Sequence, residues 1–301
     1  MSYSNAIPTP PLRDRLRTPK LLALWLLVRV ARRAPLRLLY AVSDILGTLA
    51  WAATPQLREV TRDHMRHVLG SDASSARIDR AARGCVRSAV RYYADFAYGA
   101  NHVPRPFESS EGLEHITRAS EAGRGVIILS AHLGNPESIS YATAALGLDL
   151  LILTEPLQPH AVHDFVHAIR AIAAPGVRYV PADLGGVRAA LEHLRSGGAL
   201  AVLGDRDVLG NGDPLTFFGE RARLPGGIAD LALRTGAAVV PGVALRTARG
   251  GIRAVVHPPL DLAGLDREHA RVRIARALEA GITLAPDQWF PLSPIWDGLA
   301  T

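Results

Sequence analysis

The sequence predicts an α/β sandwich with a largely parallel central sheet, preceded by a helical N-terminal region. After residue 106, short apolar runs alternate with helix-like stretches, which is typical of parallel strands joined by helices. Before residue 105, apolar positions recur at helical spacing. The chain has 301 residues, 48% of them hydrophobic, which is enough for a sizeable core.

The N-terminal region, residues 1–105, is expected to be helical throughout. Its first two helices are apolar, and the next two are charged with apolar residues at helical spacing. They cover residues 20–53, as two helices that meet near Ala34 and Pro35, then 56–69 and 77–100. Pro104 and Pro106 mark the expected boundary with the second region, residues 106–301.

The second region is expected to hold the sheet. Six apolar runs predict strands at 125–130, 149–154, 177–180, 199–204, 238–245 and 252–256. Helices are predicted between several of them, at 136–146, 159–173, 186–196 and 226–236. A last helix, at 266–281, precedes a tail that contains tryptophan and proline.

The positive charge is concentrated at the N-terminus. Residues 1–43 hold eight basic side chains and one acidic, whereas the whole chain has a net charge of +6. The basic residues interleave with LLALWLLVRV (21–30) and LRLLYAVSDILGTLAW (36–51). This pattern favours a helix lying on an anionic membrane, and a solvated helix face is the alternative. We expect no nucleic-acid partner, because no nucleic-acid motif accompanies the charge.

We expect the chain to lie on the membrane rather than to cross it. Its two apolar N-terminal stretches are interrupted by Arg29 and by Asp44, and neither reaches the about 20 apolar residues that a span needs. Cys85 is the only cysteine, so a disulfide within the chain is impossible, which fits a reducing compartment. The expected location is the cytoplasmic face of a membrane.

The stretch GVIILSAHLGNPE (125–137) carries the strongest chemical signal. It places His132 just past a strand and Glu137 in the first turn of a helix that Asn135 and Pro136 begin. A histidine at a strand end, backed by a carboxylate, is suited to activating a hydroxyl. A hydrogen-bonded loop histidine beside an ordinary first-turn acid is the alternative.

This H-x4-E spacing after an apolar strand resembles the signature of the lysophospholipid acyltransferase superfamily. Within it, the chain is similar to the branch of bacterial lipid A acyltransferases and phosphatidylinositol mannoside acyltransferases. The further blocks that carry the resemblance, in the same order as in that branch, are GDRD (204–207), FFGERARLPGGIADLALRTGAAVVPG (217–242) and APDQWFPLSPIW (285–296).

The resemblance implies roles for further residues. Asp205 resembles an acidic residue that supports the active site, and its position past a second apolar strand places it at the same sheet edge as His132. Arg170 resembles an arginine that binds a phosphate or braces the carboxylates; a helix-end arginine is the alternative. Arg206, Arg221 and Arg223 are candidates for binding the phosphates of the acyl donor.

The residues and the resemblance together predict a membrane-associated acyltransferase. His132 would act as a general base, held by Glu137, and the acceptor hydroxyl would attack a thioester directly. The implied donor is acyl-CoA, as a co-substrate and with no cofactor or metal, and the acceptor is a glycolipid or lysophospholipid, phosphatidylinositol mannoside-like by preference.

Other functions stay open. The first is a lipid A-type enzyme that uses acyl-carrier protein. The second is a metal-dependent hydrolase built on His160, His163 and His167, which share one helix face. The third is an inactive membrane scaffold.

Overall fold

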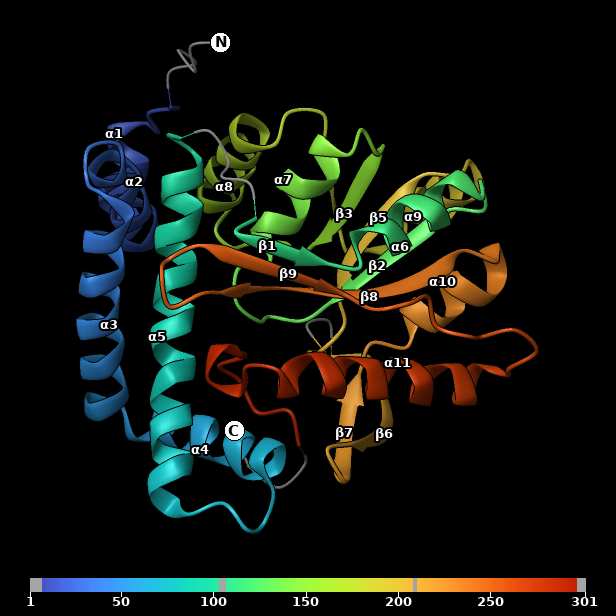
Figure 1. Ribbon diagram of the computed structural model, residues 1–301. Helices are drawn as coiled ribbons and strands as arrows, with labels where there is room; N and C mark the ends of the chain where they lie inside the picture. The colour runs from blue at the N-terminus through green and yellow to red at the C-terminus, as the bar shows by residue number, and fades with distance from the viewer. Residues whose placement is uncertain (1–6, 103–106, 208–209, 297–301) are drawn as a thin grey trace.

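A computed structural model describes residues 7–102, 107–207 and 210–296 and contains the predicted parallel sheet (Figure 1). The sheet has seven strands in the order β1-β9-β8-β2-β5-β3-β4. The β8–β9 pair is antiparallel, and the other neighbours are parallel. The strands are β1 (Ser109–Glu111), β2 (Val126–Ser130), β3 (Leu150–Thr154), β4 (Arg178–Pro181), β5 (Ala199–Leu203), β8 (Ala238–Arg246) and β9 (Ile252–Val256).

Helices cover both faces of the sheet. Alternate residues of β2 point to opposite faces, as in any strand: Val126 and Ile128 pack in a cluster with α6, and Ile127 and Leu129 pack in a cluster with α9, α10 and α11. The helices of this region are α6 (Leu113–Glu121), α7 (Glu137–Ala145), α8 (His160–Ala173), α9 (Leu184–Arg195), α10 (Gly227–Thr235) and α11 (Arg267–Thr283). Because β2 is buried on both faces, its carboxyl end is a rigid support for the loop that follows.

The N-terminal helices stand beside the sheet, and the long helix α5 lies between α3 and the strands (Figure 1). They are joined to the helices of the sheet region through shared packing: one hydrophobic cluster combines residues of α2, α3, α5 and α8. A buried ion pair of 2.6 Å between Asp95 of α5 and Arg246 of β8 adds a polar tie. The helices are α1 (Leu12–Arg17), α2 (Pro19–Ala31), α3 (Leu36–Ala53), α4 (Pro55–Leu69) and α5 (Ser75–Gly99). The expected boundary at Pro104 and Pro106 lies outside the described residues.

Among the described residues, one helix meets the length and composition of a membrane span. This helix is α3, with 18 residues, and 28% of it is buried inside the molecule. It is longer than the uninterrupted apolar stretch that the sequence indicates, because it continues through Arg37 and Asp44. Asp44 accepts two hydrogen bonds, of 2.7 and 2.5 Å, from Arg91 of α5, so α3 is tied to the folded body.

The structure adds a hairpin that the apolar pattern does not predict. It consists of β6 (Asp213–Phe217) and β7 (Glu220–Leu224), paired antiparallel. Its turn places Phe218 at φ 48° and Gly219 at φ 83°, the left-handed conformation that two-residue hairpin turns require. The sequence also missed α1, β1 and α6, which are short.

Candidate active site

The loop after β2 is held on several sides by backbone hydrogen bonds. The amides of residues 132–135 are all committed, to Asp205 Oδ2 (3.0 Å) and to the carbonyls of Ala131 (2.7 Å), Gln288 (3.1 Å) and Ala244 (2.8 Å). A tight approach explains Gly134, because a Cβ there would lie 2.1 Å from the Ala244 oxygen. These four amides therefore cannot form an oxyanion hole, so any oxyanion donor comes from another segment.

The structure pairs His132 with Asp205. Nδ1 of His132 lies 2.8 Å from Oδ1 of Asp205, which follows β5, the neighbour of β2. Asp205 is fully buried, whereas the side chain of His132 is 21% exposed. Because a carboxylate only accepts hydrogen bonds, Nδ1 carries the proton. Nε2 is then the nitrogen with a free lone pair, which is the requirement for a general base.

Asp205 is held as an anion. Burial alone would raise its pKa, but the charge of His132 and hydrogen bonds from His132 and Trp289 outweigh burial and hold the pKa below its usual range. The indole Nε1 of Trp289 donates to Oδ2 at 2.8 Å. A buried anion hydrogen-bonded to Nδ1–H fixes the tautomer of the imidazole and stabilises the imidazolium that forms when Nε2 takes a proton.

Glu137 does not hold His132, which corrects the role that the sequence predicts. Its Oε1 accepts hydrogen bonds from Arg170, at 2.6 and 3.2 Å, and from the Tyr92 hydroxyl, at 2.7 Å. Among the described residues no hydrogen bond joins Glu137 to His132. The charge and hydrogen bonds of Arg170 outweigh burial and lower the pKa of Glu137, so it is ionised. The first turn of α7 is thus a structural anchor beside the loop that follows β2.

The resemblance left two roles open for Arg170, binding a phosphate or bracing the carboxylates. Its contacts fit the second role. It is mostly buried, and its guanidinium forms a fork on Glu137 and also approaches the Tyr92 hydroxyl, at 3.4 Å. Burial would lower the pKa of Arg170, but Glu137 and Tyr92 raise it above its ordinary value. This ion pair ties α8 to α7 and, through Tyr92, to α5.

The three proposed donor-binding arginines lie at the surface near the ends of β5 and β7. Arg206 follows Asp205 directly, and its guanidinium pairs with Glu155 at 2.8 Å. Arg221 and Arg223 are exposed on β7, where they alternate with the buried Ala222 and Leu224. Arg223 donates to the Gly212 carbonyl at 3.1 Å. Their contact with a donor stays a prediction.

The histidines considered as metal ligands, His160, His163 and His167, lie on α8, the helix that also carries Arg170. The rings of His163 and His167 are 4.1 Å apart, and burial lowers the pKa of His167 to about 4. Within residues 7–102, 107–207 and 210–296 no group of three or more histidine, cysteine, aspartate or glutamate side chains is placed to hold a metal ion.

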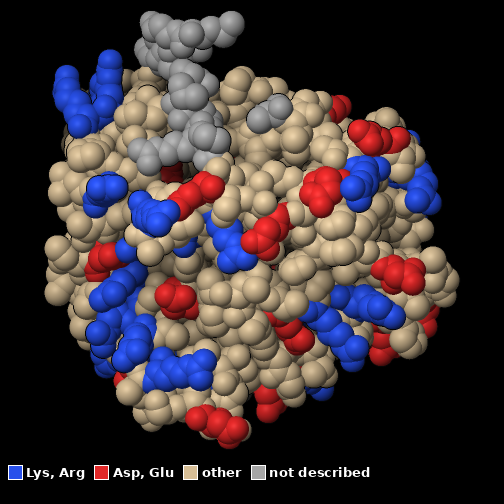
Figure 2. All heavy atoms as spheres, in the orientation of Figure 1, with Lys and Arg blue, Asp and Glu red and all other residues tan. Residues whose placement is uncertain are grey.

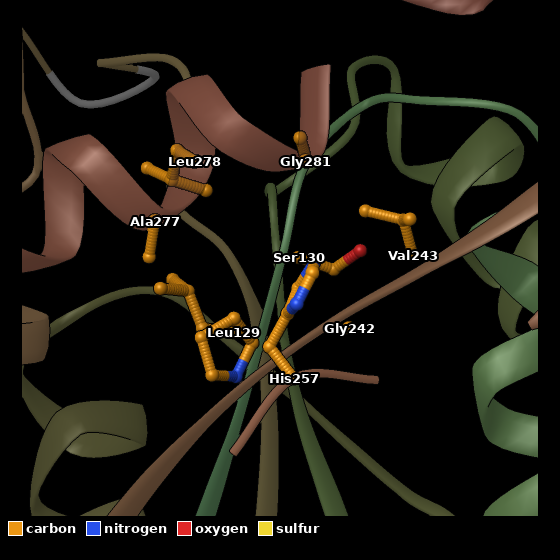
Figure 3. Close-up of a pocket in the computed structure, with 10 residues that line it drawn as sticks. Leu129, Ser130, Gly242, Val243, His257, Ala277, Leu278 and Gly281 are labelled. Carbon is orange, nitrogen blue, oxygen red and sulfur yellow. The ribbon is translucent and has the colours of Figure 1, made fainter. Parts of the chain in front are cut away.

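A small apolar cavity lies between β2, β8 and α11 (Figure 3). Its volume is about 10 Å³, room for one water molecule. Ser130 Oγ and His257 Nε2 line it, and neither has a hydrogen-bond partner in the described part of the chain. It is far too small for an acyl chain.

The sequence does not indicate two residues that contact the site carboxylates, Trp289 and Tyr92. Trp289 follows the short helix η1 (Pro286–Gln288) in a block that the family resemblance includes without assigning a role. Tyr92 lies in α5, and nothing in its local pattern separates it from other helix residues. Only the three-dimensional fold brings either one to a carboxylate.

Comparison with known proteins identifies the family. The family model of the bacterial lipid A biosynthesis acyltransferases matches residues 11–297. The chain belongs to this family. It is therefore an acyltransferase, and its family places it in lipid biosynthesis.

Two relatives narrow the likeness. The chain is 26% identical to a phosphatidylinositol mannoside acyltransferase of Mycolicibacterium smegmatis over 220 residues, which cover 70% of this chain and 72% of the relative. It is 29% identical to one of Mycobacterium tuberculosis over 191 residues, which cover 62% of this chain and 58% of the relative.

Proposed function

We propose that this acyltransferase moves a long-chain acyl group from acyl-CoA to a hydroxyl of a phosphatidylinositol mannoside-like glycolipid. The observation that carries the proposal is the His132–Asp205 pair at the carboxyl end of the parallel sheet, with Nδ1 held at 2.8 Å. The mycobacterial relatives, which are phosphatidylinositol mannoside acyltransferases, support the acceptor class.

The reaction follows from the orientation of the imidazole. Nε2 of His132 takes the proton of the acceptor hydroxyl as the oxygen attacks the thioester carbonyl carbon. The C–S bond then breaks, and the imidazolium returns the proton to the leaving thiolate. Transfer is direct: Cys85 is buried and its thiol pKa is raised by burial, which suits a core residue rather than a nucleophile.

The membrane surface is the second part of the proposal. Helix α3 exposes one continuous apolar face. Its members Leu38, Val42, Ile45, Leu46 and Leu49 are 46–61% exposed. Basic side chains gather along the side of the molecule that the N-terminal helices form (Figure 2). An exposed apolar face flanked by positive charge suits an anionic bilayer, at the cytoplasmic face of the bacterial membrane.

Product analysis tests this function. Purified protein is incubated with palmitoyl-CoA or palmitoyl-acyl-carrier protein, and with a phosphatidylinositol mannoside, a lysophospholipid or a lipid A precursor. Mass spectrometry of the lipids should show the acylated mannoside with palmitoyl-CoA as donor. Transfer from acyl-carrier protein alone would overturn the donor, and acylation of the lipid A precursor alone would overturn the acceptor.

A further inference from the structure

We propose that Trp289 is a positioning residue of this site: its indole N–H holds the Asp205 carboxylate in the orientation that keeps His132 a base. The kinetic test of this inference rests on the proposed function. Trp289 lies outside the H-x4-E and GDRD blocks.

The hydrogen bonds of Asp205 define what Trp289 adds. Oδ1 accepts from His132 Nδ1, at 2.8 Å, and Oδ2 accepts from the His132 amide, at 3.0 Å. Both donors belong to the residue that Asp205 has to orient. The Trp289 indole, at 2.8 Å from Oδ2, is the donor that comes from a different segment. It therefore ties the carboxylate to a segment other than the His132 loop.

Trp289 itself is held rigidly. It is fully buried, and its ring packs against those of His64, Phe217, Phe218 and Trp296, at centroid distances of 5.3, 6.4, 6.3 and 6.3 Å. A side chain enclosed by four rings keeps a single orientation, because any other rotamer would open a void in a close-packed interior.

The backbone around Trp289 grips the same loop. Phe290 donates to the His132 carbonyl at 2.8 Å, and the Gln288 carbonyl accepts from the Gly134 amide at 3.1 Å. The Gln288 side chain makes two hydrogen bonds to the backbone of Arg246, at 2.8 and 2.9 Å. Residues 288–290 thus fix the His132 loop by its main chain and Asp205 by its side chain, so both members of the pair share one support.

The indole N–H also favours the ionised carboxylate. Without it, Oδ2 would keep a single donor in a fully buried position, and the anion would be less well stabilised. The Asp205 carboxylate has to stay ionised to hold His132, and loss of a donor to the anion raises the pKa of Asp205. Loss of the indole N–H therefore moves the acid limb of the pH–rate profile to higher pH, an effect that a merely structural tryptophan would not have.

Trp296 provides a matched control. It is equally buried, and its Nε1 donates a hydrogen bond of 2.9 Å to the Phe217 carbonyl rather than to a site residue. Trp289→Phe and Trp296→Phe each remove one buried indole N–H from the same aromatic cluster. Replacing Trp289 by benzothienylalanine removes the N–H and keeps the shape of the ring, so it separates the hydrogen bond from the packing.

The experiment compares pH profiles of kcat for the full-length protein and these three variants. We expect Trp289→Phe and the benzothienyl variant to lose about 10- to 100-fold in kcat, with the acid limb moved to higher pH and the KM for the acyl donor unchanged. Trp296→Phe should keep the wild-type limb. A benzothienyl variant with wild-type kcat and pH profile would overturn the proposal.

A readout without turnover keeps this test independent of the proposed function. In protein with ¹⁵N-labelled histidine, the neutral form of the His132 ring should show Nδ1 protonated and Nε2 unprotonated. The benzothienyl variant should mix the two tautomers. An unchanged tautomer in that variant would overturn the role of Trp289, whether or not the wild-type protein acylates the lipids offered.

Discussion

His132 Nδ1 and Asp205 Oδ1 lie 2.8 Å apart although 73 positions separate them in the chain. The register of the sheet explains the contact. Strands β2 and β5 are parallel neighbours in which Ser130 is paired with Leu203, also 73 positions apart. The chain continues two residues past each partner, so the histidine and the aspartate emerge side by side. The His132–Asp205 pair is thus a direct product of strand pairing.

Asp205→Asn should remove this control of the tautomer. An asparagine amide can donate to Nδ1 and leave the proton on Nε2, which then cannot act as a base. We expect kcat to fall at least about 10²-fold without a comparable rise in the KM for the acyl donor. Asp164→Asn, at an exposed position of α8, is the control and should keep wild-type rates. Equal rates for the two variants would refute the role of Asp205.

The Glu137–Arg170 pair should contribute mainly to stability. Glu137→Gln leaves a buried guanidinium without its counter-charge, which costs roughly 3–5 kcal/mol when a buried pair is broken. Turnover should be impaired, but less than in His132→Ala. The double variant Glu137→Leu/Arg170→Leu should recover much of the lost free energy of unfolding, measured in urea. If the double variant loses as much free energy of unfolding as Glu137→Leu and Arg170→Leu lose together when measured singly, the two side chains are not coupled.

Stability should rise with pH between about 4 and 6.5 because of His64. Burial, and then the nearby charge of His67, lower the pKa of His64 to about 4, whereas an unfolded histidine titrates near pH 6.5. In this window the unfolded state binds more protons, so the free energy of unfolding falls as pH falls, by roughly 3 kcal/mol at most. Glu137 and Asp205 have lowered pKa values, so their contribution is lost only at more acidic pH. In His64→Gln, urea unfolding at several pH values should show a flatter curve; an unchanged slope would contradict this assignment.

The apolar face of α3 should govern binding to vesicles. Ile45→Glu/Leu49→Glu places two charges on side chains that are 61% and 60% exposed, so the fold should survive. Sedimentation with anionic vesicles should weaken at least about tenfold, since burying one such side chain is worth about 1.5–3 kcal/mol. Added salt should weaken wild-type binding further.

The control for that experiment is Leu233→Glu/Val272→Glu, two exposed apolar positions on α10 and α11, outside the apolar face of α3. It should sediment like the wild type. If both double variants sediment equally well, the membrane contact lies elsewhere. Deletion of residues 1–53 is not a clean alternative, because Leu21, Val28 and Tyr40 belong to the hydrophobic core.

The sequence predicted the sheet well because its strands are apolar runs of the length expected for strands buried on both faces. It also placed His132 and Asp205 at one edge, since both follow such runs. It missed the hairpin because Phe218 occupies a turn position where asparagine, aspartate or glycine is the usual signal.

The partners within the site were harder to predict. Spacing suggested Glu137 for His132, because the two are five residues apart. The actual partner depends on which strands are neighbours, and strand order is not a local property of the sequence. For the same reason, the sequence alone does not link Trp289 to Asp205 or Tyr92 to Glu137.

The most direct test of the account is the rate of acyl transfer by His132→Ala, measured with palmitoyl-CoA and a phosphatidylinositol mannoside under conditions in which the wild type is active. His132 is 21% exposed and its main-chain hydrogen bonds do not need the side chain, so the variant should fold and still bind the donor. Loss of a general base predicts at least about a 10²-fold lower kcat. A rate close to that of the wild type would contradict the central claim that His132 is the base.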